Sequence, residues 1–526
     1  MITKKTLRRV SHLGLLGSLS AFTTLYSLGT HASSTCSPGK SFTITSSVPH
    51  DVNKTSKRLD YSQACNEEAA YFAWQQFLAL SWQSNYSEKK PTRGTPDTTW
   101  DYSKAYTPGQ PLVWETYAHR SELRPAGTPL NTPFDKPPTY LFVNQPSAGP
   151  GNPSFSLFNN LDEDNEIGSC DIYLGQGKPA TQDLVLYQAK VNAAEYDYIK
   201  TTFGAEQNNP KGTLAKAAIA NQQSILKNKK NSAKGINLPA GKYGGSEGAI
   251  EIKTAFLRVT KDNKAMLNDF FKTSAIYYTA DYDKKTKSYS NYQYHNDTFA
   301  LLGIHIIHKT TAYPDFIFTS FEHEKLSNMD FKYRLLAPLP PTYSDFNPHG
   351  APAAPAGNQT GNRQAINRQS GSSPTSNGQL YPIPPYLDAV TKKVHKQLSA
   401  LNNTSVWLNY RLIGVQANIT EGWSATPSSS PLSGPNHFMA NHVIESDAFL
   451  GNFFGPGFGS NPFPTGSAGN GDNIALDGNT YNMGGCKGCH GVAQTSFGTD
   501  FSFLLDFGVD KPVVNPDTIH YHPGEP

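Results

Sequence analysis

The chain has 526 residues, of which 37% are hydrophobic, 12% aromatic and 17% charged. Aromatic side chains bury large areas, so this composition excludes a disordered or fibrous protein and indicates a folded one. The length allows two domains, or one large domain with insertions. The five cysteines are too few for a disulfide scaffold.

The first 32 residues have the pattern of an export signal. Four cations stand within residues 1–9 and precede a short apolar run over 13–22, and Ala32 is a small residue at the expected cleavage position. We predict cleavage after Ala32, with an uncleaved membrane anchor as the alternative. The mature protein would then be periplasmic or secreted, with no stable membrane span.

The formal net charge of +3 comes from this signal. Residues 33–526 hold 41 cations against 42 acids, so the mature chain carries a net charge of −1. Because a near-neutral chain lacks the basic surface that binds phosphates, we expect no nucleic-acid partner.

Two helices and six strands are predicted before residue 338. An amphipathic helix spans 67–82, where Phe72, Phe77 and Leu80 recur at helical spacing, and a weaker helix spans 214–226. Together the elements predict an α+β fold whose N-terminal region, 60–337, is mainly antiparallel β with packed helices. Runs rich in Ile, Val, Tyr, Phe and Thr predict the strands over 139–143, 183–191, 249–259, 275–280, 298–308 and 315–321.

Residues 338–385 differ in composition from the rest of the chain. The segment 348–380 contains no aromatic residue and few large aliphatic ones. It cannot bury enough apolar surface to offset the entropy of ordering, so we expect a flexible linker or a long surface loop.

Ordered structure is predicted again after this segment. A helix over 387–401 places Val390 and Val394 on one face, and an alternating strand follows over 406–412. The Gly- and Pro-rich stretch 451–478 predicts a long irregular loop. The C-terminal region is therefore expected to be smaller and rich in loops.

The sequence CKGCH over 486–490 matches the C-x-x-C-H pattern by which c-type haem is attached. Two thiols three positions apart can bond to the two vinyl groups of one haem, and the imidazole of the next residue then ligates the iron. The motif predicts one covalently bound haem c, with Cys486 and Cys489 as attachment residues and His490 as the metal ligand. Residues 386–526 would then form a C-terminal haem c region.

Three alternatives explain the motif less well. A zinc site requires four ligands, and no second pair of Cys or His residues lies nearby in the sequence. A thioredoxin-like C-x-x-C requires a βαβ setting, whereas this motif follows a Gly-rich stretch. A plain disulfide leaves His490 unexplained.

The other three cysteines are Cys36, Cys65 and Cys170. In an oxidising compartment two of them are expected to pair. The pairs Cys36–Cys65 and Cys65–Cys170 are equally compatible with the sequence.

The sequence does not identify the second axial ligand of the iron. In a regular strand over 298–308, His305 and His308 point to opposite faces, so they cannot both face one pocket. An iron without a sixth protein ligand is a further alternative. The candidate ligands are Met439, His442, His437 and Met329, together with His305, His308 and His323 from the first region.

Two further groups of polar residues are weaker candidates for a site. The segment 321–324 (FEHE) could hold a metal, but a solvated strand edge explains it better. Glu251 and Lys253 share one face of a predicted strand and are expected to balance charge. No acid–base arrangement identifies catalytic residues.

The chain resembles a group of exported bacterial proteins known as cytochrome c family, or cytochrome c domain-containing, proteins with a single C-terminal C-x-x-C-H motif. The resemblance implies a monohaem protein in which Cys486 and Cys489 form thioether bonds and His490 is an axial ligand. It implies no substrate. The similar stretches are 65–82, 111–123, 249–259, 301–323, 439–446 and 486–505, which leaves out the segment 338–385.

These observations predict an exported monohaem c-type cytochrome that transfers electrons as its iron cycles between Fe(III) and Fe(II), with a redox protein as partner. One alternative is a haem-dependent oxidoreductase of the peroxidase or oxidase type, with an open iron site and a small-molecule substrate. The other is a haem-based binding or sensor module. The length of the chain favours a role beyond simple shuttling, and the missing acid–base arrangement favours electron transfer.

Overall fold

The computed structural model describes these residues: 36, 42–59, 63–87, 89–123, 130–136, 158–163, 170–175, 183–204, 213–225, 235–283, 288–335, 360–362, 383–417, 441–444, 473–476, 479–482, 485–494 and 498–505. All of them belong to one structural unit, which spans 34–526. The expected export signal and the predicted strand over 139–143 lie outside the described residues.

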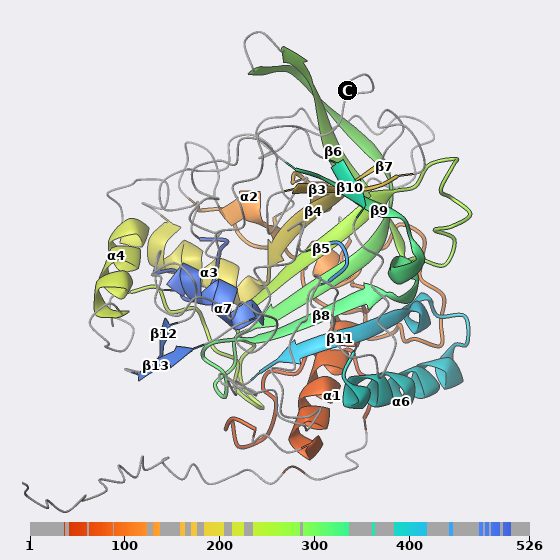
Figure 1. The fold of residues 1–526 in the computed structure, drawn as a ribbon. Coiled ribbons are helices and arrows are strands. Elements are labelled where there is room, and N and C mark those ends of the chain that lie inside the picture. The colour runs from red at the N-terminus through yellow and green to blue at the C-terminus, as the bar shows by residue number, and fades with distance from the viewer. Residues whose placement is uncertain are drawn as a thin grey trace, which may run out of the picture. The chain divides into compact units, whose positions relative to one another are not determined.

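A largely antiparallel sheet of eleven strands organises the described residues (Figure 1). Its central strands β4 (Asp183–Val191), β5 (Ile250–Arg258) and β7 (Ser288–His308) are each antiparallel to the next. The first part of β7 forms a long hairpin with β6 (Lys272–Asp283), and its last part pairs with β8 (Ile317–His323). β5 lies on one side of β7, and β6 and β8 share the other side.

The C-terminal part of the chain extends this sheet. β11 (Tyr410–Gln416) pairs with β8 on the side away from β7. β10 (Thr360–Asn362), a short strand within the segment expected to be a linker, pairs with β9 (Phe331–Leu335). The main hydrophobic core includes buried residues from Phe42 to Leu505, so the N-terminal and C-terminal regions share it.

Helices lie around the sheet, and α1 and α6 pack together and against β11 (Figure 1). The α-helices are α1 (Gln63–Leu80), α2 (Arg120–Leu123), α3 (Ala193–Phe203), α4 (Thr213–Ile225), α6 (Pro385–Leu401) and α7 (Gly485–Val492). Three short 3-10 helices are η1 (Trp114–Thr116), η4 (Glu324–Asn328) and η5 (Val406–Asn409). The remaining strands are β1 (Ala118–His119), β2 (Asn160–Leu161), β3 (Cys170–Leu174), and the separate pair β12 (Asn473–Leu476) and β13 (Asn479–Asn482).

The predicted α+β fold class is confirmed. Both N-terminal helices and five of the six predicted strands form at the expected places, and the strand expected over 183–191 has the predicted bounds. The helix expected over 387–401 forms as α6. The strand expected over 406–412 begins later, because a 3-10 turn occupies 406–409 and β11 starts at Tyr410.

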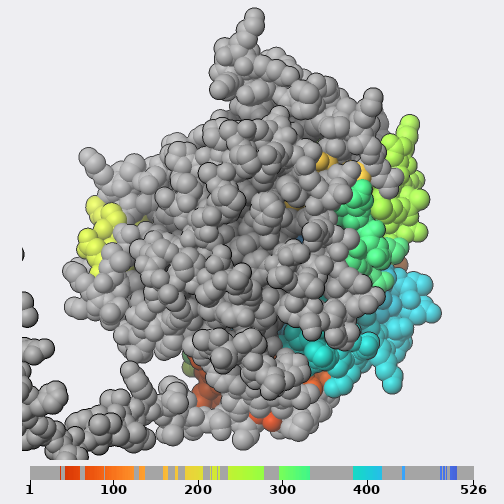
Figure 2. Space-filling view, viewed as in Figure 1, coloured from red at the N-terminus to blue at the C-terminus, as the bar shows by residue number. Residues whose placement is uncertain are grey.

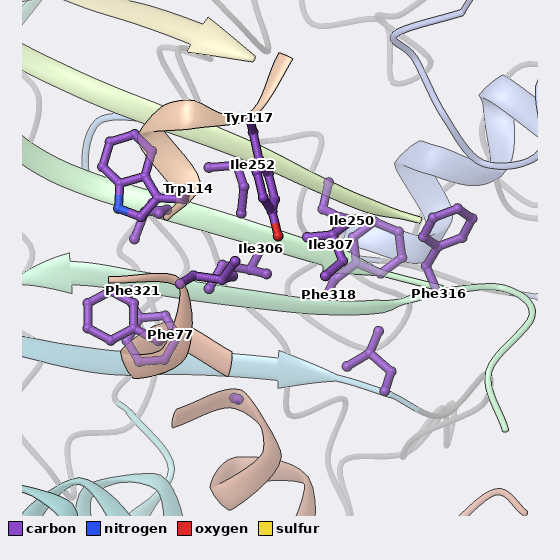
Figure 3. Packing of buried hydrophobic residues seen from close by; sticks show 14 of the residues in the cluster. Phe77, Trp114, Tyr117, Ile250, Ile252, Ile306, Ile307, Phe316, Phe318 and Phe321 are labelled. Atoms are coloured by element: carbon purple, nitrogen blue, oxygen red, sulfur yellow. The ribbon is translucent and has the colours of Figure 1, made fainter. Parts of the chain in front are cut away.

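The apolar face of α1 packs against the sheet through aromatic rings (Figure 3). Phe77 stacks on Phe321 of β8 with ring centroids 4.2 Å apart, and Trp74 meets the same ring edge-on at 4.9 Å. Each of these rings is almost completely buried. Burial of an aromatic ring contributes several kcal/mol, so this face of the sheet is the main hydrophobic support of the fold.

The segment that precedes α1 is tied to it by a disulfide between Cys36 and Cys65. Of the two pairings that the sequence left open, the structure has this one. Cys170 belongs to β3.

Part of α6 lies at the surface (Figure 2). Lys392 and Asp388 of this helix form an ion pair between exposed side chains. Within the residues that the structure describes, none of the helices is both long and apolar enough to span a bilayer.

Candidate functional site

The C-x-x-C-H sequence forms α7, an eight-residue helix. With 3.6 residues per turn, positions 486, 489 and 490 fall on one face of this helix. Cys486 is buried and is not part of a disulfide. The helical conformation therefore places the two cysteine positions one turn apart, with the histidine position beside them.

Lys487, the residue after the first cysteine of the motif, holds α7 on the sheet. Its ammonium group is completely buried and donates to the Asp315 carboxylate at 2.8 Å and to the Phe316 carbonyl. Its backbone amide donates to Oε1 of Gln416, at the end of β11, at 2.9 Å. The helix is thus bonded to the start of β8 and to the end of β11.

A second cation completes this buried ion cluster, since the Arg58 guanidinium also contacts the Asp315 carboxylate. Burial alone raises the pKa of Asp315, but Lys487 and Arg58 outweigh burial and lower it. Asp315 is therefore ionised in the folded protein, and the cluster is a fixed anchor for α7.

His490 is held in one orientation and one tautomer. Its Nδ1 lies 2.7 Å from the carbonyl oxygen of Phe501, which can only accept, so Nδ1 carries the proton and Nε2 keeps its lone pair. The imidazole packs between the rings of Phe318 at 4.7 Å and Phe503 at 5.0 Å. The pKa of His490 is lowered to about 3, mainly by burial and also by Lys253 and Lys487, against the opposing effect of the bond to Phe501, so the ring is neutral.

The Phe501 carbonyl, which accepts from His490, lies in a loop with strained backbone conformations. Asp500 and Phe501 have positive φ angles of 58° and 65°, which non-glycine residues rarely adopt. Thr499 fixes this loop to the end of α7, because its backbone amide and its hydroxyl both donate to the Ala493 carbonyl at 3.1 Å. The Asp500 amide donates to Oε1 of Gln494 at 3.0 Å.

One face of the sheet carries a row of polar side chains between α7 and residues 441–444. We call this set, Glu251, Lys253, His305, Ser320 and Glu322, the polar strip. In the register, Lys253 is opposite His305, which is opposite Ser320. Because directly opposed residues share a face, these three side chains lie side by side across β5, β7 and β8.

The ends of the polar strip approach different parts of the chain. Glu251 is level with Phe318, against which His490 packs. Glu322 lies four residues along β8 from Phe318, a distance of about 13 Å. The strip therefore starts beside His490 and ends at the residues around His442.

The polar strip lowers the stability of the fold, because polar side chains on a buried sheet face lose their hydrogen bonds to water. Within the described part of the chain, Ser320 Oγ and Glu251 Oε1 have no hydrogen-bond partner, although both side chains are buried. An unsatisfied buried polar group costs about 1–3 kcal/mol. Such groups are expected where a ligand or ordered water completes their hydrogen bonds.

Glu322 organises the far end of the strip. Its two carboxylate oxygens accept from Arg411 at 2.8 Å and from the His442 ring at 3.0 Å. Glu322 and His323 are both completely buried, and β8 lies between β7 and β11. The interpretation of 321–324 as a solvated strand edge is therefore wrong, because β11 covers the edge that the sequence alone left open.

The structure divides the candidate axial ligands by sheet face. His305 faces the polar strip, whereas His308 points to the opposite face and contacts Gln76 and Phe72 of α1. The expectation that His305 and His308 point to opposite faces is confirmed. His323 also lies on the α1 side, stacked on Phe270.

Of the other candidates, His442 lies beside Glu322 on the same face as His305. Met329 is buried in a second hydrophobic cluster with Leu326 and Val443. His437 and Met439 lie outside the described residues.

Several residues that the sequence did not single out build this site: Asp315, Gln416, Phe501 and Ser320. Gln416 and Asp315 are separated from Lys487 by 71 and 172 residues. Their role depends on strand pairing, so no local pattern marks them. The positive φ of Phe501 likewise has no sequence signal, because glycine is the usual residue there.

The described residues contain no group of three or more His, Cys, Asp or Glu side chains arranged to hold a bare metal ion. A haem needs less from the protein, because the porphyrin supplies four ligands and one imidazole can supply the fifth. His490 is placed to do so. Comparison with known proteins adds nothing to this: no family model matches the chain, and no curated protein or solved structure matches it.

Proposed function

We propose that the chain is an exported monohaem c-type cytochrome, with a haem bonded to Cys486 and Cys489 and ligated by His490. The proposal includes the resemblance to exported cytochrome c family proteins and the periplasmic or secreted location. Bound there, a haem c supplies a one-electron couple between Fe(III) and Fe(II). The partner would be a redox protein that gives or takes that electron.

The state of His490 is the single observation that supports this proposal best. Imidazoles that ligate metals commonly donate their other N–H to a carbonyl or carboxylate, which fixes the tautomer and orients the ring. The bond from His490 Nδ1 to the Phe501 carbonyl has this form. A strained loop maintains it, as expected where backbone geometry serves a function.

The surrounding residues would set the electronic properties of the iron. The Phe501 carbonyl makes the imidazole a stronger electron donor, which favours Fe(III). The rings of Phe318, which is buried, and Phe503, which is half-buried, pack against the imidazole and would limit the access of water to that side of the iron. Low dielectric there disfavours the more highly charged oxidised state, so the two effects oppose each other.

A haem-dependent oxidoreductase is the second candidate, and the polar strip favours it. His305 and Ser320 are buried polar groups that face the side of the sheet on which His490 lies. In an enzyme they would bind a small polar substrate. In an electron-transfer protein one of the histidines on this face, His305 or His442, would occupy the sixth position instead.

Carbon monoxide binding separates the two candidates. We expect the reduced protein to show a low-spin haem c spectrum that carbon monoxide leaves unchanged. His305→Ala and His442→Ala are then tested for the appearance of carbon monoxide binding, with His395→Ala on α6 as a control. Ready binding by the unmodified protein would contradict fixed six-coordination and support the enzyme, and a spectrum without haem bands would overturn both.

A further inference from the structure

Three carboxyl groups are buried together beside the loop that orients His490. Glu195 comes from α3, Glu251 from β5 and Asp500 from the loop after α7, and their exposures are 0%, 4% and 1%. Lys309 donates to Asp500 Oδ2 at 2.5 Å, and the Leu238 amide donates to the same oxygen at 2.6 Å. Asp500 is thus paired with a cation, whereas Glu195 and Glu251 lie close enough to interact electrostatically with Asp500, and Glu195 also with Glu251.

Hydrogen bonds of Asn192 bring the backbone around Glu195 and Glu251 together. Asn192 joins β4 to α3. Its side-chain oxygen Oδ1 accepts from the backbone amides of Ile250 at 3.1 Å and Glu195 at 3.2 Å. The Asn192 amide donates to the Ile250 carbonyl at 3.0 Å. The first turn of α3 is therefore clamped to β5 at the residue next to Glu251.

The two glutamates lack the partners that a buried charge requires. Neither carboxylate oxygen of Glu195 has a hydrogen-bond partner within the described residues, nor does Oε1 of Glu251. Glu251 is hydrogen-bonded to the Ser502 hydroxyl and also interacts electrostatically with Lys253. Two carboxylates that repel each other in a buried site without a bonded cation cannot both be ionised, so at least one of them is protonated.

Electrostatics supports the same conclusion. Burial raises the pKa of Glu251 to about 7, with Asp500 adding to the effect and Ser502 and Lys253 opposing it. Burial and the neighbouring Glu251 and Asp500 raise the pKa of Glu195 well above its usual value. The N-terminus of α3 favours the ionised form of Glu195, but burial is the larger influence.

This pair is connected to the ligand of the proposed haem. Ser502, the partner of Glu251, follows Phe501, whose carbonyl accepts from His490, and Asp500 precedes it. A change of one charge at the iron would therefore act on the pair through one short loop in a medium of low dielectric.

We propose, on the basis of the proposed function, that Glu195 and Glu251 act as one proton-binding pair: one of the two carboxylates takes up a proton from solvent on one-electron reduction and releases it on oxidation. The electron comes from the redox partner, and the only bond formed or broken is a carboxyl O–H bond. Reduction removes one positive charge from the iron, so the nearby carboxylate loses an attractive partner and binds a proton more tightly. The charge at the site is thereby kept constant.

The other titratable or charged groups around the pair come from several parts of the chain. They are Asp500 on the loop, Lys309 after β7, Lys253 on β5, and Glu247 and Tyr198, which are linked to the pair through Asn192 and Asp500.

Midpoint potentials of the holoprotein at pH values from about 5 to 9 test this proposal. The midpoint potential should fall as pH rises near neutrality. The fall should be at most about 59 mV per pH unit, which for one electron corresponds to a tenfold change in the equilibrium constant of reduction. Glu251→Gln and Glu195→Gln should each remove this slope. Glu324→Gln, at an exposed position after β8, is the matched control and should keep it.

Infrared difference spectra give a second readout, in which reduction should raise a protonated-carboxyl band that Glu251→Gln abolishes. A haem protein with a potential independent of pH would overturn this inference and leave the proposed function intact. A slope that survives in both glutamine variants would assign the proton elsewhere, such as to a haem propionate, and would also overturn it. A protein without haem would overturn both.

Discussion

Two aromatic residues adopt left-handed backbone conformations, and each presents its carbonyl to α7. Phe316, with φ of 63°, accepts from Lys487, and Phe501, with φ of 65°, accepts from His490. Each such conformation costs about 1–3 kcal/mol, so both persist only because surrounding bonds hold them. At the scale of the residue, this strain shows how firmly the C-x-x-C-H helix is positioned.

Lys487→Met tests the buried anchor of this helix. It removes the cation that faces Asp315 at 2.8 Å and leaves a buried carboxylate with Arg58 alone. We expect a loss of about 3 kcal/mol in the free energy of unfolding, measured by urea denaturation. Lys392→Met, which breaks a pair with side chains 75% and 40% exposed, should change it by less than about 0.5 kcal/mol. Equal effects of the two substitutions would contradict the anchor.

Glu251 should make stability depend on pH. Its pKa is raised by burial to about 7 in the folded protein, against a usual value of 4.5. Below pH 4.5 the carboxyl is protonated in both states, so its raised pKa does not change the free energy of unfolding. As pH rises from 4.5 to about 7, the free energy of unfolding falls progressively, and above about 7 the loss is constant. Glu251→Gln should therefore gain on the order of 2 kcal/mol in stability, relative to the unmodified protein, between pH 5 and pH 8.

Urea unfolding of both proteins at the two pH values measures this difference. Glu324→Gln, on the exposed turn after β8, provides the control and should show the same offset at both. An offset for Glu251→Gln that does not change with pH would show that this carboxyl titrates normally in the fold.

At the scale of the element, the sequence predicted the helices and strands that depend on local residue preferences. The helix expected over 67–82 and the strand expected over 183–191 form as α1 and β4, where the sequence places them. The short β10 has no such signal, since it forms only by pairing with β9. The same limit applies to the neighbours of α7, because Asp315 and Gln416 reach it through strand pairing rather than sequence proximity.

The acidic pair shows why the rest of the site could not be predicted. Glu195 and Glu251 are ordinary residues of a helix and a strand in the sequence. The pairing of β4 with β5, which places Val191 opposite Glu251, and the bonds of Asn192 to Ile250 bring them together over 58 residues. The motif at 486–490 could be recognised as a candidate because covalent haem attachment, where it occurs, requires a fixed spacing of residues, whereas a charge cluster imposes no spacing.

The disulfide is an element-scale contribution to stability. Cys36 and Cys65 close a loop with a sequence separation of 29 residues that joins the chain before α1 to the helix itself. Loop closure of this length restricts the unfolded chain by about 3–4 kcal/mol. Cys36→Ser with Cys65→Ser should lower the free energy of unfolding by about this amount in urea, and a loss below 1 kcal/mol would contradict the pairing.

At the scale of the whole molecule, one sheet joins both candidate functional regions. The strands β5, β7 and β8 carry apolar side chains toward α1 and the polar strip toward α7. The same sheet thus supports the C-x-x-C-H helix α7, the polar strip and the buried pair of Glu195 and Glu251. Each of these depends on the same strand register, so a fault in the sheet would disturb all three.

Covalent haem content tests the central claim most directly. The protein is expressed with the haem-attachment machinery of an exporting cell, denatured, extracted to remove unbound haem, and assayed for haem per chain by its absorption spectrum. We expect one haem per chain to stay with the denatured polypeptide, and Cys486→Ala with Cys489→Ala to retain none. A denatured chain without haem, or haem retained by the double variant, would contradict the assignment of this helix as the attachment site.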